Sequence, residues 1–182
     1  HDVALARYMP GGALDPSFDR DGTVVVDLGA RSELVADVAI QPDGKIVVGG
    51  ASIDASGSGF FAARFLPDGA LDPSFGTGGH AVALIADSPI DGAVAIQSDG
   101  DIVVAGWAAG GATAMVVVRF GPDGRLDPAF GNGGVARTDG SETRVGNALA
   151  LQPDDSIVVA GRTGPKHGYD AMGAIRFTPA GQ

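Results

Sequence analysis

The stretch Arg64-Phe-Leu-Pro-Asp-Gly-Ala-Leu-Asp-Pro-Ser-Phe75 decides the fold, because related stretches occur before and after it in the chain. Residues 7–18 and 119–130 repeat it, and the leucines of the three Leu-Asp-Pro steps are 57 and 55 residues apart. A second motif, A-I-Q-P-D-G-K-I-V-V-G-G at residues 39–50, returns at residues 95–106 and 150–161. Two independent motifs in one register predict a single structural unit that is used repeatedly.

Each repeat contains four short β-prone runs, separated by Gly, Pro and Asp clusters that favour tight turns. In the middle repeat these runs cover roughly residues 91–97, 101–107, 114–121 and 134–138. Four antiparallel strands in a repeat of about 55 residues are typical of a β-propeller blade. A right-handed parallel β-helix is the alternative fold, but its repeats are usually much shorter. We therefore expect an all-β fold built from four-stranded propeller blades.

The composition supports a globular, turn-rich β protein. The 182 residues are 45% hydrophobic and include 30 Gly and 11 Pro. The net charge of -10 makes nucleic acid an unfavourable partner, because a phosphate backbone would be repelled. We expect neither a membrane span nor an intact signal peptide in this chain. The absence of Cys excludes disulfides, thiolate metal sites and Cys nucleophiles.

The order of the strands predicts an incomplete ring. If the innermost strands are residues 35–41, 92–97 and 146–152, the chain forms thirteen strands. The expected division is a partial blade at 1–30, complete blades at 31–86 and 87–139, and a blade at 140–182 that lacks its last strand. Closed propellers have about 4 to 8 blades, so such a half-ring would expose an apolar flank and open strand edges.

We expect self-association to close this ring. In that hypothesis two chains are related by twofold symmetry in a ring of about six or seven blades, and the N-terminal strands of one chain complete the last blade of its partner. The alternative is that the chain is a piece of a longer array of repeats.

The polar and aromatic residues that recur once per repeat are interpreted as structural. We expect a bidentate Arg–Asp pair to fix the connection that follows each third strand. Aspartates in the tight turns are expected to cap their own backbone, and one Phe per repeat is expected to fill the space between blades. These residues are Arg7, Arg64, Arg119 and Arg176; Asp15, Asp72 and Asp127; Asp43, Asp68, Asp99 and Asp123; and Phe18, Phe75 and Phe130.

Candidate ligand-binding residues lie in the loops that differ between repeats. These loops are expected on one face of the propeller, where function is most often found. Trp107 could bind a sugar, peptide or aromatic ligand, or it could simply cover an apolar patch at the blade edge. The predicted binding residues are Trp107, Arg144, Arg162, Lys166, His167 and Tyr169.

The inventory for catalysis is small. His167 with Tyr169 or Glu142 could form an acid–base pair, whereas His80 is expected to be a solvated residue at the edge of an outer strand. No cofactor is predicted. A divalent cation such as calcium is an alternative, either at the turn aspartates or at the ends of the inner strands, where the candidate ligands are Asp37, Asp91, Glu142 and Asn147.

The two signatures, R-[FY]-x-P-x-G-x-L-D-P-[SA]-F and A-[IL]-Q-P-D-G-x-I-V-V-[AG]-G, resemble the bacterial delta-60 repeat family, a domain of unknown function with propeller-like repeats. The resemblance covers nearly the whole chain and implies a propeller fold in a bacterial, secreted or cell-surface protein. It implies no activity. The chain departs from the signatures at Gly11, Ser98 and Asp155.

Two functions remain open at this point. The first is a non-catalytic ligand-binding or assembly module. The second is a propeller enzyme, a hydrolase or lyase, with its active site on the variable-loop face or in the central channel.

Overall fold

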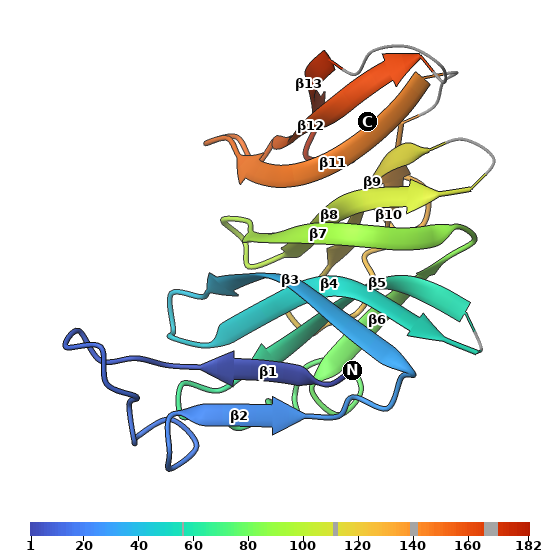
Figure 1. The fold of residues 1–182 in the computed structure, drawn as a ribbon. Coiled ribbons are helices and arrows are strands. Elements are labelled where there is room, and N and C mark those ends of the chain that lie inside the picture. The colour runs from blue at the N-terminus through green and yellow to red at the C-terminus, as the bar shows by residue number, and fades with distance from the viewer. Residues whose placement is uncertain (56, 111–112, 139–141, 166–170) are drawn as a thin grey trace.

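A computed structural model describes residues 1–182 except residues 56, 111–112, 139–141 and 166–170. It contains four antiparallel sheets that are stacked side by side (Figure 1). The first sheet has two strands, β1 (Val3–Ala6) and β2 (Thr23–Val26). The second has four: β3 (Ser32–Ile40), β4 (Ile46–Asp54), β5 (Gly57–Phe65) and β6 (His80–Ile85).

The third sheet repeats the second, and the fourth repeats its first three strands. The third consists of β7 (Ser88–Ile96), β8 (Ile102–Ala109), β9 (Ala114–Phe120) and β10 (Val135–Arg137). The fourth consists of β11 (Glu142–Leu151), β12 (Ile157–Pro165) and β13 (Ala171–Phe177). Each complete sheet follows the order of the chain, so every pair of neighbouring strands is a simple antiparallel hairpin or connection.

This architecture confirms the expected propeller blades and shows that the parallel β-helix alternative is wrong. The first strands of the three larger sheets, β3, β7 and β11, lie next to one another (Figure 1). Three apolar clusters fill the spaces between neighbouring sheets, one at each junction. Among the described residues, no helix is long and apolar enough to cross a membrane.

The last glycine of the second signature is explained by a bulge in the facing strand. Each inner strand has a register shift, and in β3 it lies between Val35 and Asp37. A Cβ atom on Gly50 of β4 would lie 2.0 Å from the carbonyl oxygen of Leu34, and one on Gly161 of β12 would lie 1.8 Å from that of Val145. Only glycine allows the two backbones to approach this closely, so the motif encodes the bulge.

Two local expectations are confirmed. The turn aspartates accept hydrogen bonds from the backbone N–H two residues on, at 2.9 to 3.1 Å. The recurring phenylalanines are almost fully buried between sheets, and each packs against a turn glycine of the next sheet. These contacts pair Phe18 with Gly69, Phe75 with Gly124 and Phe130 with Gly181.

Candidate functional site

The recurring arginines connect neighbouring blades as well as fixing their own. Arg64 Nε donates to Asp72 Oδ2 at 2.8 Å, while its Nη1 donates to the carbonyl oxygen of Pro122, 58 residues further on in the next blade. The guanidinium also lies 4.7 Å from the ring centroid of Phe75, as a cation–π contact. One side chain therefore joins its own third strand, the following connection and the next blade.

The expected Arg–Asp pair is confirmed, but it is not bidentate. Arg64 reaches one carboxylate oxygen of Asp72, because the other accepts hydrogen bonds from the N–H and the hydroxyl of Ser74. Arg7 binds Oδ2 of Asp15 in the same way, through Nε, whereas Arg119 donates to Oδ2 of Asp127 from both Nε and Nη2. Arg176 differs, since the Leu-Asp-Pro segment has no counterpart after it in this chain, and its Nη1 donates to Gln152 at 3.5 Å.

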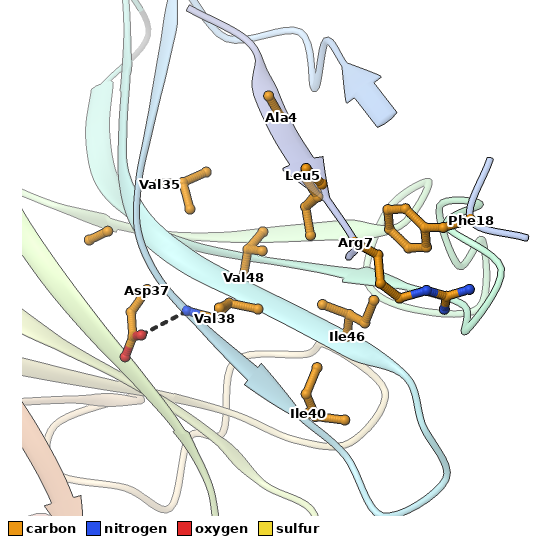
Figure 2. A pocket seen from close by; sticks show the side chains of 12 residues that line it. Ala4, Leu5, Arg7, Phe18, Val35, Asp37, Val38, Ile40, Ile46 and Val48 are labelled. Atoms are coloured by element: carbon orange, nitrogen blue, oxygen red, sulfur yellow. Dashed lines mark hydrogen bonds between the residues drawn. The ribbon is translucent and has the colours of Figure 1, made fainter. Parts of the chain in front are cut away.

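A groove of about 520 Å³ lies between β1 and the inner strands β3 and β4, beside the first of these arginines. Figure 2 shows Leu5 and Phe18 on one side, and Val35, Val38, Ile46 and Val48 on the other. The groove is open because the two-stranded first sheet ends at β1 on this side. Its wall is therefore mainly apolar sheet surface.

Comparison with the next blade shows what normally covers this surface. Val38 and Ile40 of β3 are 53% and 63% exposed. By strand register, Val38 corresponds to Val94 of β7, which is only 7% exposed because the inner strands of the preceding sheet pack over it. The expected apolar flank of an incomplete ring is thus present, and it exposes side chains that a preceding pair of inner strands would bury.

The polar groups of the groove are already engaged. Asp37 accepts a hydrogen bond from its neighbour Val38 N–H at 2.8 Å (Figure 2), and its other oxygen accepts one from Val94 N–H of the next blade at 3.0 Å. Arg7 donates to Asp15, Ser17 and the carbonyl of Pro67. The described lining therefore suits the binding of apolar or β-strand surface better than acid–base chemistry.

The predicted ligand-binding residues belong to a different part of the fold. Trp107 is half-buried in β8, where it pairs with Ile90 and Met115. Arg144 of β11 and Arg162 of β12 lie on neighbouring strands of the last sheet, and Arg144 N–H donates to the carbonyl of Thr113 in the preceding blade. Lys166, His167 and Tyr169 lie outside the described residues, as does the side chain of Glu142. The binding and catalytic roles of these residues remain predictions.

The alternative cation sites are the inner strand ends and the turn aspartates. The described part of the chain contains no group of three or more His, Asp or Glu residues placed to hold a metal ion. The side chains of Asp91 and Glu142 fall outside it, and both oxygens of Asp37 are occupied by backbone N–H groups.

The expectation about His80 is confirmed for its place on an outer edge strand but not for its solvation. His80 begins the outer strand β6, as expected, but its side chain is only partly exposed and its Nδ1 atom is buried. Leu28, in the segment that follows β2, lines the same small cavity as His80.

Comparison with known proteins agrees with this geometry. Residues 2–18, 41–75 and 97–130 match the model of a family described as "Domain of unknown function (DUF5122) beta-propeller". The chain is a propeller-like repeat domain. The matched segments contain the Arg–Asp pairs, the turn aspartates and the buried phenylalanines, so the similarity follows the residues that join this domain's blades.

Solved structures show a more distant likeness. An alpha-L-arabinofuranosidase from Clostridium thermocellum is 12% identical, with a TM-score of 0.46 over 81% of this chain and 48% of that enzyme. The chain therefore spans about half the length of that enzyme. No curated protein matched the sequence.

Sequence reasoning predicted the exposed flank but not the residues of the groove. Val38 and Ile40 look like those of any other inner strand, since Val94 and Ile96 carry similar side chains at equivalent positions. The available signal was that the first group of β-prone runs in this sequence contains only two strands, β1 and β2.

Proposed function

We propose that the chain is a non-catalytic assembly module whose open groove accepts two inner strands from a second copy. The observation that carries this proposal is the contrast between Val38, 53% exposed, and its buried equivalent Val94. An exposed apolar sheet face beside an open strand edge favours the addition of further strands.

The last sheet of a second copy supplies the matching strands. β11 and β12 are the inner pair of a blade that lacks its outer strand, whereas β1 and β2 are the outer pair of a blade that lacks its inner strands. Joining them completes one blade at each of two equivalent junctions. A twofold ring of about six blades results, within the range of closed propellers.

This joining leaves one strand too many, because β1 and β13 both correspond to the third strand of a blade. We propose that β1 replaces β13 of the partner. Arg7 of β1 has its aspartate and a bond to the next blade. Among the described residues, Arg176 of β13 instead has a long hydrogen bond of 3.5 Å to Gln152 and an electrostatic interaction with Asp154. β13 is also poorly covered, with Met172 95% exposed.

An engineered cross-link tests the junction directly, because the wild-type chain contains no Cys. In the complete blade, Val117 of β9 pairs with Ala105 of β8. The equivalent residues are Leu5 in β1 and Ala160 in β12. The strands β1 and β12 lie at opposite ends of the stack of sheets in one chain (Figure 1). Oxidation of the double variant Leu5→Cys/Ala160→Cys should therefore produce a covalent dimer.

The controls separate this junction from other contacts. Each single Cys variant can form at most one chance disulfide, and Leu5→Cys/Met172→Cys keeps the number of thiols while moving one to exposed β13. Light scattering of the unmodified chain should give a dimeric mass across a dilution series. A monomeric mass, or a dimer that fails to cross-link through residues 5 and 160, would overturn the proposal.

The delta-60 relationship and a secreted or surface setting in a bacterium remain predictions.

A further inference from the structure

A small, partly enclosed cavity lies away from the groove, between the segment that follows the first sheet and the first complete blade. Its volume is about 20 Å³. Three polar side chains line it, together with apolar residues: Glu33 of β3, Ser52 of β4 and His80 of β6, with Leu28, Ala30, Phe61 and Val82.

Two buried polar atoms at this cavity lack a hydrogen-bond partner among the described residues. Glu33 is only 3% exposed, and its Oε1 accepts a hydrogen bond from Ala30 N–H at 3.0 Å, but its Oε2 has none. Nδ1 of His80 is likewise buried without a partner. A buried carboxylate oxygen that forms no hydrogen bond carries a large desolvation cost, so both atoms require a partner inside the cavity.

Comparison with the same three positions in the next blade shows that their polar side chains occur together. Strand register makes Pro89, Ala108 and Val135 the equivalents of Glu33, Ser52 and His80. All three positions are polar in one blade and all three are apolar in the other. One isolated polar residue could be accidental, but a coordinated change at three positions on separate strands indicates that the side chains serve one bound molecule.

We propose that the cavity binds a single water molecule that bridges Oε2 of Glu33 and Nδ1 of His80. A buried water needs roughly 10 to 15 Å³ and two to four polar partners, and both conditions are met here. The water donates one hydrogen to the carboxylate oxygen and forms its second bond with the imidazole. The Ser52 hydroxyl is a third available partner.

The bridge joins the inner strand of this blade to its outer strand. β3 and β6 are not neighbours in the sheet, since β4 and β5 lie between them. The cavity also contacts Leu28 and Ala30, which connect the first sheet to this blade. The bound water therefore stabilises the junction between the first sheet (β1 and β2) and the first complete blade (β3 to β6). This junction is on the side of the blade that faces away from the sheet of β7 to β10.

A crystal structure of the full chain at a resolution that shows ordered water tests the proposal. We expect one density peak roughly 2.6 to 3.2 Å from both Oε2 of Glu33 and Nδ1 of His80. An empty cavity or a direct contact between the two side chains would overturn it. Soaking with rubidium distinguishes a cation, because an anomalous peak at this position would also overturn the assignment as water.

Stability measurements give an independent test. His80→Val alone should lower the thermal midpoint, because it leaves the Glu33 carboxylate with a poorly bound water. The triple variant Glu33→Leu/Ser52→Ala/His80→Val, which makes the cavity apolar like its equivalent, should recover most of that loss. Additive losses in the triple variant would contradict a shared water, and the matched change Val135→Ala in the next blade controls for simple loss of packing.

Discussion

Ser98 and Asp155 hydrogen-bond to each other across two neighbouring blades, although 57 residues separate them in the chain. Ser98 N–H donates to Asp155 Oδ1 at 3.1 Å, and its hydroxyl donates to Oδ2. These are two of the positions where the chain departs from its repeat signatures, with Ser in place of Pro and Asp in place of Gly. A proline at position 98 would remove the N–H, so the two departures depend on each other.

This relationship predicts coupling between the two positions. Asp155 has a left-handed φ of 59°, which costs energy for a residue other than glycine. Ser98→Pro alone should destabilise the fold by about 1 kcal/mol, since it removes both hydrogen bonds and keeps the strained Asp. The double variant Ser98→Pro/Asp155→Gly restores the signature and should return close to wild-type stability. Urea unfolding of the four proteins measures the coupling, and additive effects would show that the two residues are independent.

The arginine of the first complete blade should be more important for stability than that of the partial blade. The side chains of Arg64 and Asp72 are 7% and 4% exposed, whereas those of Arg7 and Asp15 are 33% and 23% exposed. Arg64→Ala leaves the buried carboxylate of Asp72 with the more distant Lys45 Nζ, at 3.5 Å, as its cation and should cost about 3 kcal/mol. Arg7→Ala should cost about 1 kcal/mol or less, because water screens the pair.

Denaturant unfolding of Arg64→Ala and Arg7→Ala provides the comparison, with Arg64→Lys as the control. Lysine keeps the charge but cannot bind Asp72, Ser74 and the Pro122 carbonyl at once. It should therefore recover little of the loss. Equal costs for Arg64→Ala and Arg7→Ala would show that burial does not determine the contribution of the pair.

The lowered pKa of Asp72 predicts how the stability of the fold depends on pH. Burial raises the pKa of its carboxyl, but the hydrogen bonds from Ser74 and the Arg64 guanidinium outweigh burial and lower the pKa to about 2 from 3.8. The folded state therefore binds this proton less readily than the unfolded state. The resulting stability, about 2 kcal/mol, is complete above pH 3.8 and is lost as the pH falls toward 2.

Unfolding free energies measured between pH 2 and pH 6 test this expectation, with Asp72→Asn as the comparison. The variant should be less stable near neutral pH and should lose less stability on acidification than the wild type. Parallel pH profiles for the two proteins would contradict the assigned role of Asp72.

One repeat position has Ser in two blades and Ala in the middle blade, and this difference predicts a stabilising substitution. Ser17 and Ser74 donate to the second oxygen of their aspartates, but Ala129 takes this place in the middle blade, where only its N–H contacts Asp127. Ala129→Ser should stabilise the fold by about 0.5 to 1 kcal/mol by adding a hydrogen bond to a charged acceptor. Thermal unfolding checks this, and Ala129→Val serves as a control that adds volume without a hydroxyl.

Charges placed in the groove should disrupt assembly and leave the fold intact. Val38→Lys and Ile40→Lys alter side chains that are exposed in the single chain, so each variant should keep the β-sheet circular dichroism spectrum of the wild type. Both changes would bury a charge under added strands and should shift the chain to the monomer in sedimentation velocity experiments. Leu84→Lys is the matched control, because Leu84 is 62% exposed on the outer strand β6. If Leu84→Lys also abolished the dimer, the effect of the other two variants could not be assigned to the groove.

Much of the scaffold could be predicted from the repeats because its determinants are local. The Leu-Asp-Pro and Gln-Pro-Asp-Gly steps specify turns within a few residues, and Asp43 caps its own turn as expected. The pairing of Arg64 with Asp72 spans only eight residues, so spacing suggested it. Its reach to Pro122 was not predicted, because that contact depends on how closely the blades stack.

The sequence alone therefore determined the four-stranded repeat, its turns, its buried phenylalanines and the incompleteness of the two terminal sheets. Each of these follows from motifs that act within one repeat and recur in register. Only the tertiary structure decided that Ser98 meets Asp155, that Glu33, Ser52 and His80 surround one cavity, and that Val38 lines an open groove. These features join residues from different strands or blades, and their positions depend on strand register, β-bulges and the packing of one sheet on the next.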